Sequence, residues 1–274
     1  HFMVLVEAAR AATSHLPTDA RVGLAPHSLR ATSPDDLKRM LAWGKHGPIH
    51  IHAAEQPKEV QDIEAWLKAR PVDWLLDNCA LSSDWCLIHA THMTEAETVR
   101  LARSGAVAGL CPITEANLGD GPFNGPAYLD AGGAFGVGSD SNVNIALTGE
   151  LQMLEYSQRL RDISRNVLVR GEGSVGQTLY LGAARGGAQA LGRKAGEIKV
   201  GHLADLVAIN TTAPSLCALS SQQLLDGLVF ASRDDVVTDV WSAGRHQVRQ
   251  GRHVAHDTIV ETYRKAIDGL LSSL

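Results

Sequence analysis

The stretch PIHIHAAE, residues 48–55, is an apolar run that carries two histidines one residue apart. Side chains alternate between the two faces of a β-strand, so both histidines would face one way and the isoleucines the other. His52 would lie at the strand end, whereas His50 would lie one layer deeper, hydrogen-bonded in the interior. Glu55 would follow in the loop beyond the strand. The place of this strand in the strand order decides which fold the chain forms.

Strand-like and helix-like patterns alternate on both sides of this stretch. Strands are expected at RVGLAPH (residues 21–27), WCLIHATH (85–92), AVAGLC (106–111) and AFGVGSD (134–140). Amphipathic helical patterns separate them, and no hairpin turn joins neighbouring strands. This alternation predicts an α/β fold with parallel strands and crossover helices, because parallel strands need long connections and are buried on both faces.

The C-terminal third has a different pattern. From about residue 196 the chain consists of short β segments separated by glycine turns, and an amphipathic helix closes it. We therefore expect three parts: residues 1–195 form the parallel α/β portion, residues 196–256 form a small β portion, and residues 257–274 form a C-terminal helix.

The composition is that of a globular protein without a basic binding surface. The 274 residues are 45% hydrophobic and carry a net charge of −5, which argues against a nucleic-acid partner. No apolar run approaches the roughly 20 residues that span a bilayer, and no leader is visible, so no membrane partner is expected. Four scattered cysteines without a CxxC pair indicate reduced thiols and a cytoplasmic protein.

Titratable side chains recur at the ends of the expected strands, at His27, His52, His89 and Asp140. A single histidine on a strand is most often a packing or surface residue. Four such residues at successive strand ends are harder to attribute to packing, because parallel strands converge on one edge, where the active sites of (β/α)8 barrels lie. Imidazole and carboxylate groups suit a catalytic zinc ion. We therefore expect His52, Glu55, His89 and Asp140 to form one functional set.

These residues resemble the motifs of the amidohydrolase superfamily, in its aminohydrolase (deaminase) branch. HxxE at His52, IHATH at His89 and GSDS at Asp140 occur in the family's order, and GEIKVGHLADLVAIN (196–210) is similar to its composite β-sandwich. Within the branch, the chain is most similar to enzymes that act on N-formimino-L-glutamate. The stretches that carry this similarity are GLAPHSLRA (23–31), HIHAAEQ (50–56), CPITEANLGDG (111–121), GVGSDSN (136–142) and LEYSQRLRDISRNVL (154–168).

The resemblance implies a TIM-type (β/α)8 barrel with one divalent metal ion, most commonly zinc, although the ligand set also suits iron. It implies that His52 is the metal ligand of strand five and that Asp140, from strand eight, is both ligand and general base. His89, from strand six, would orient the water or the intermediate, and Glu55 would be the proton shuttle. A further HxH metal pair would come from strand one.

The resemblance also implies a reaction: the hydrolytic deimination of N-formimino-L-glutamate to N-formyl-L-glutamate and ammonia, in histidine degradation. Arg30 and His27 would bind the small acidic substrate, because a guanidinium group suits a carboxylate. Family members are commonly homodimers. Two alternatives stay open: a deaminase of the same branch that acts on a purine or pyrimidine, and a non-catalytic fragment or scaffold.

Spacing places the HIH strand late in the barrel. His52 and Asp140 are 88 residues apart, which fits three strand–helix units of about 29 residues each. Seven units would leave only about 12–13 residues each, too few for a strand, a helix and loops. HIH would then be strand five and RVGLAPH strand four. We expect strands one to three, with their HxH pair, to be absent from this chain, and the fragment alone to be inactive.

Overall fold

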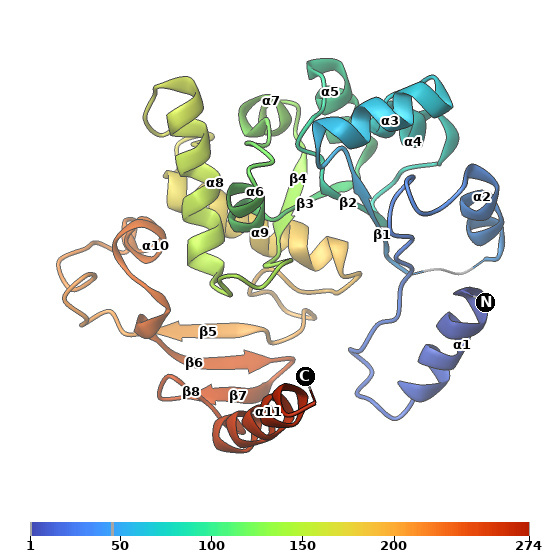
Figure 1. Cartoon of the computed structure of the whole chain (residues 1–274). Helices are drawn as coiled ribbons and strands as arrows, with labels where there is room; N and C mark the ends of the chain where they lie inside the picture. The colour runs from blue at the N-terminus through green and yellow to red at the C-terminus, as the bar shows by residue number, and fades with distance from the viewer. Residues whose placement is uncertain (1, 45–46, 274) are drawn as a thin grey trace.

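A parallel β-sheet forms the centre of the computed structural model, which describes residues 2–44 and 47–273. Its strands are hydrogen-bonded in the order of the chain (Figure 1): β1 (Ile49–Ala53), β2 (Trp85–His89), β3 (Val107–Leu110) and β4 (Ala134–Val137). All three pairings are parallel. The carboxyl ends of these strands therefore meet at one edge of the sheet.

Helices return the chain from each strand to the next. Those between β1 and β4 are α3 (Pro57–Leu67), α4 (Pro71–Asn78), α5 (Glu95–Ser104), α6 (Pro112–Leu118) and α7 (Gly125–Asp130), and β4 is followed by α8 (Leu147–Asp162) and α9 (Val175–Ala190). Their starts follow from the sequence: proline occupies the first turn of α3, α4 and α6, and Thr94 begins α5 with a capping box to Glu97. Helix α9 packs against β4 so closely at Gly186 that a Cβ there would lie 2.0 Å from the carbonyl oxygen of Phe135.

The segment expected to be the fourth barrel strand pairs with β1 only at two isolated bridges, Leu24 with Ile49 and Ser28 with His52. The N–H of His50 donates to Leu24 O, but that of His52 donates to His27 O. Pro26 explains the interruption, because it has no N–H to continue the ladder. The prediction of a regular strand over 21–27 is therefore wrong, although its parallel course beside β1 is retained. Two helices flank this segment, α1 (Phe2–Ala12) and α2 (Pro34–Ala42).

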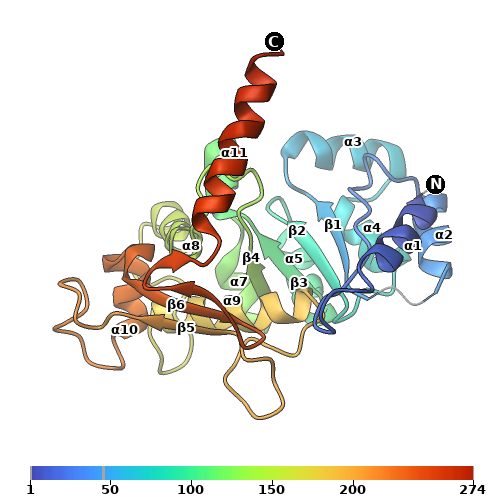
Figure 2. The ribbon, with the colours of Figure 1, turned by 90° about the horizontal axis from the view of Figure 1, so that it is seen from below.

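A second sheet is antiparallel and lies below the parallel sheet in Figure 1. Its strands are β5 (Leu206–Ile209), β6 (Val237–Ser242), β7 (Arg245–Arg249) and β8 (Arg252–His253). Short helical turns link β5 to β6: α10 (Leu224–Asp226), η1 (Gly227–Ala231) and η2 (Asp234–Val236). Helix α11 (His256–Leu271) buries no residue and projects from this sheet (Figure 2).

The arrangement is the mixed α/β fold expected, consistent with a TIM-type barrel. Ile51, Leu87 and Ala108, on three neighbouring strands, are completely buried in the main core. The missing strands, the full sandwich and the division at 195 and 256 remain predictions, and the chain ends at 1 and 274 lie outside the described residues. Within the described ranges, no helix is both long and apolar enough to cross a membrane.

Candidate metal and active site

Three of the predicted site histidines come together at the carboxyl ends of the parallel strands. The ring of His52, at the end of β1, stacks on that of His27 with centroids 4.8 Å apart. It lies 5.4 Å from the ring of His89, at the end of β2. His50 is separate from this group, because its Nε2–H donates to the carbonyl oxygen of Ala190 at 2.7 Å. This agrees with the interior, hydrogen-bonded role predicted for it.

The contacts of His52 suit a metal ligand. Its Nδ1 lies 2.9 Å from His27 O, and a carbonyl oxygen only accepts, so Nδ1 carries the proton. Nε2 is then left with a free lone pair. Burial lowers the pKa of His52 and the hydrogen bond to His27 offsets this only in part, so the neutral form is favoured. A neutral imidazole with its second nitrogen bound to a carbonyl is the form in which histidine binds metals.

The remaining ligands are not assembled around His52. Among the described residues, no group of three or more His, Cys, Asp or Glu side chains is placed to hold a metal ion. Asp140 follows β4 in an exposed turn and has neither a hydrogen bond nor an ion pair with a described residue. The structure therefore brings His52, His89 and His27 together, but does not bring Asp140 into contact with them. The donor chemistry fits a divalent metal, as one part of a larger ligand set.

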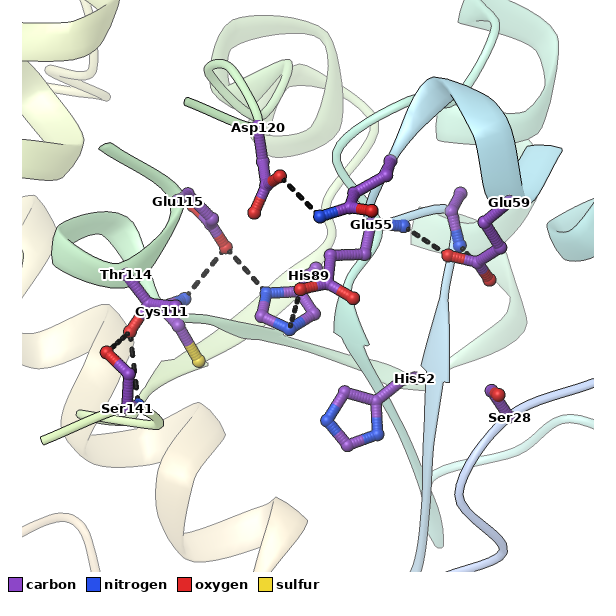
Figure 3. A network of polar contacts seen from close by, with 12 residues as sticks. Ser28, His52, Glu55, Glu59, His89, Cys111, Thr114, Glu115, Asp120 and Ser141 are labelled. Carbon is purple, nitrogen blue, oxygen red and sulfur yellow. Dashed lines mark hydrogen bonds and ion pairs between the residues drawn. The ribbon is translucent and has the colours of Figure 1, made fainter. Parts of the chain in front are cut away.

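His89 is buried between two carboxylates, as Figure 3 shows. Its Nδ1–H donates to Oε1 of Glu115 at 3.2 Å, and its Nε2 lies 3.6 Å from Oε1 of Glu55. Burial alone lowers the pKa of His89. The hydrogen bond to Glu115 and the negative charges of Glu115, Glu55 and Asp140 outweigh that effect, so the pKa is raised. This imidazole can hold a proton and present it to the site through Nε2.

Glu55 lies between this histidine and a cation. Nη2 of Arg30 is 3.3 Å from Oε2 of Glu55, whose side chain is 14% exposed. The side chain of Arg30 is 36% exposed, so a ligand can reach it. The predicted proton shuttle and the predicted carboxylate-binding residue are therefore neighbours in one site.

The backbone is left-handed where the strands end. Ala54 (φ 54°), His89 (φ 67°), Ala90 (φ 51°) and Asp140 (φ 38°) all have positive φ angles, which are uncommon outside glycine. Such residues persist only where the surrounding structure holds them, and they cluster in functional sites. All four of these positions are predicted site residues or adjoin one.

Three buried acidic residues of this region were missed by the sequence analysis. Glu115 binds His89, and Glu59 accepts hydrogen bonds from the N–H groups of Ala54 and Glu55. Asp120 accepts a hydrogen bond from Gln56 Nε2 at 3.0 Å. Glu115 and Asp120 lie within the CPITEANLGDG stretch that carried part of the resemblance. Glu59 lies in the first turn of α3, where acidic residues are common for reasons of helix capping alone.

Comparisons with known proteins identify the family. The profile of the amidohydrolase family matches residues 4–246. A formimidoylglutamate deiminase from Pseudomonas aeruginosa is 47% identical over 252 residues, which are 91% of this chain and 56% of the relative. The crystal structure of an amidohydrolase from Brucella melitensis has a TM-score of 0.91 at 47% identity and covers 98% of this chain and 59% of its own.

A more distant relative of known structure contains zinc. An adenosine deaminase from Xanthomonas campestris, solved with bound zinc, has a TM-score of 0.86 at 25% identity, covering 98% of this chain and 62% of its own. This chain thus spans just over half the length of the relatives it matches. Since the family profile covers most of its residues, the chain belongs to the amidohydrolase family.

Proposed function

We propose that this chain is part of a metal-dependent hydrolase that converts N-formimino-L-glutamate to N-formyl-L-glutamate and ammonia, a step of histidine degradation. The observation that carries the substrate choice is the guanidinium of Arg30, 3.3 Å from the carboxylate of Glu55. A substrate with two carboxylates needs a cation beside the reacting group, and Arg30 provides one. The 47% identity to a formimidoylglutamate deiminase supports the same choice.

One divalent metal ion, zinc or iron, would be held by His52 and Asp140 together with an HxH pair outside this chain. The metal would lower the pKa of water and so supply a hydroxide nucleophile near neutral pH. The tautomer of His52 supports its part in this set, because Nε2 is free to bind. Asp140, in its exposed turn, would take the proton that the attacking water gives up.

His89 and Glu55 would act on different atoms bound to the formimino carbon. Nε2 of His89 would donate a hydrogen bond to the oxygen that gains negative charge, a role that its raised pKa supports. Glu55 would give a proton to the nitrogen that leaves as ammonia. The 3.6 Å between His89 Nε2 and Glu55 Oε1 keeps both groups within reach of one small substrate.

Arg30 and His27 would orient the substrate through its carboxylate. Arginine offers two parallel N–H donors to a carboxylate, which fixes direction as well as position. In the structure one of these donors is occupied by Glu55. A bound substrate carboxylate would therefore compete with Glu55 for Arg30.

The proposal is tested by ammonia release from the full-length, metal-loaded protein. N-formimino-L-glutamate should be hydrolysed far faster than any member of a panel of purines and pyrimidines. The second candidate is a heterocycle deaminase, favoured by the similarity to an adenosine deaminase; faster turnover of adenosine or another heterocycle would establish it instead. A full-length protein that binds no metal and hydrolyses nothing would indicate a scaffold.

A further inference from the structure

Glu59 holds the backbone at Glu55 in place through hydrogen bonds. Its side chain projects from the first turn of α3 and is buried, with 2% of the residue exposed. Oε1 accepts a hydrogen bond from the N–H of Ala54 at 3.1 Å, and Oε2 accepts one from the N–H of Glu55 at 2.9 Å. Figure 3 shows this carboxylate beside the loop, on the side away from Glu115.

The loop that Glu59 holds is short and strained. Only three residues, Ala54 to Gln56, separate the end of β1 from the start of α3, and Ala54 has φ 54°. Without Glu59, the N–H groups of Ala54 and Glu55 would lose their charged acceptor in a buried setting. On the far side of the loop, Gln56 is held by Asp120 at 3.0 Å. The direction in which the Glu55 side chain leaves the backbone is thus set from both sides.

That direction matters because it places the Glu55 carboxylate between two other groups of the site. Its Oε1 lies 3.6 Å from His89 Nε2, and its Oε2 lies 3.3 Å from Arg30 Nη2. A shift of about 1 Å in a reacting group can cost around a hundredfold in rate. We propose that Glu59 is a positioning residue, whose carboxylate holds the Glu55 backbone where the Glu55 side chain can deliver its proton. This assignment rests on the proposed function, in which Glu55 is the proton donor.

The chain contains a matched control for a purely structural role. Glu155, in α8, is also a buried glutamate that accepts hydrogen bonds from two consecutive N–H groups, those of Val167 and Leu168, both at 3.0 Å. It also binds Arg159 at 2.6 Å. Removing its charge should therefore disturb the fold at least as much as removing that of Glu59. Glu155 has no contact with the site histidines or with Glu55.

The test compares four variants of the full-length, metal-loaded protein with N-formimino-L-glutamate as the probe: Glu59→Gln, Glu155→Gln, Glu55→Gln and the double variant Glu55→Gln/Glu59→Gln. We expect Glu59→Gln to lower kcat about 10- to 100-fold with metal content retained and KM changed less than about threefold. The double variant should have the kcat of Glu55→Gln, because Glu59 acts only through Glu55. Glu155→Gln should lower Tm and leave kcat within about twofold.

Several outcomes would overturn the assignment. One is a Glu59→Gln enzyme with wild-type kcat. Another is a double variant whose kcat is reduced by the product of the two single-variant losses, because Glu59 would then act independently of Glu55. If Glu59→Gln does not fold, Glu59→Asp keeps the charge but shortens its reach, and a wild-type kcat in that variant counts equally against the assignment. A wild-type protein that does not act on N-formimino-L-glutamate overturns the proposed function itself, and with it the proton-donor role of Glu55.

Discussion

Nδ1 of His89 and Oε1 of Glu115 lie 3.2 Å apart, and both side chains are buried. The same oxygen of Glu115 accepts the N–H of Cys111 at 2.9 Å, just before α6 begins. The carboxylate is therefore fixed by the backbone of one strand–helix connection while it holds the imidazole of another. Both the orientation and the charge of His89 depend on this residue.

Replacing Glu115 by glutamine should lower the pKa of His89. Glutamine can still accept a hydrogen bond, but it removes the negative charge that helps to raise the pKa against the effect of burial. NMR titration of the imidazole in wild type and Glu115→Gln measures the shift directly. We also expect kcat to fall about 10- to 100-fold, the cost typical of losing an outer hydrogen-bond partner at a metal site. An unchanged His89 titration would show that Glu115 does not set its charge.

The two histidines of the HIH stretch should behave differently when removed. His52→Ala removes a nitrogen with a free lone pair, so the full-length protein should lose metal and, with it, activity. His50→Ala removes the hydrogen bond to Ala190 O and should cost stability while metal content is retained. Metal analysis beside thermal unfolding separates the two effects. Metal loss in His50→Ala with retention in His52→Ala would reverse the assignment of the ligand.

The parallel sheet could be predicted because its strands are apolar runs that end in polar residues. The alternation around Ile51 and His52 gave the correct faces, since side-chain period is fixed by strand geometry. The segment at 21–27 was less regular than predicted because one residue, Pro26, removes a ladder donor. In that segment the absence of one backbone N–H leaves two isolated bridges in place of a continuous strand.

The candidate site was harder to predict than the sheet. A sequence can place His89 or Asp140 at a strand end, but it does not show which side chains then meet: His89 contacts Glu55, whereas Asp140 stands in an exposed turn. Glu59 and Glu115 were missed because their roles come from burial and from the backbone N–H groups they accept, which no spacing rule shows. In the sequence each is an ordinary glutamate at the start of a helix.

Glu150 should make stability depend on pH. Burial raises its pKa from 4.5 to about 7, although a hydrogen bond from Ile113 N at 2.9 Å partly opposes this. Between pH 4.5 and about 7 the folded chain therefore keeps a proton that the unfolded chain releases. The protonated Glu150 side chain stabilises the fold fully below pH 4.5, and this contribution is lost as pH rises to about 7. The difference in unfolding free energy between Glu150→Gln and wild type should therefore increase, in favour of the variant, by at most about 3 kcal/mol as pH rises from 4.5 to 8.

Denaturant unfolding at a series of pH values measures this gain. Glu172→Gln, at an exposed position, controls for the loss of one negative charge. A difference between Glu150→Gln and wild type that stays constant from pH 4.5 to 8 would mean that Glu150 does not titrate in the folded protein over this range.

Arg30 should determine which substrates the enzyme accepts. A hydrogen bond between charged groups contributes about 1.5–3 kcal/mol, so Arg30→Gln should raise KM for N-formimino-L-glutamate by about 10- to 150-fold. A neutral amidine such as formamidine has no carboxylate for Arg30 to bind, so its kcat/KM should change little or rise as Glu55 loses its competing partner. Arg100→Gln removes an arginine paired with Asp73 and Asp77 on α4, and it should leave kcat/KM for both substrates unchanged. Equal losses on the acidic and the neutral substrate would mean that Arg30 supports Glu55 and does not bind the carboxylate.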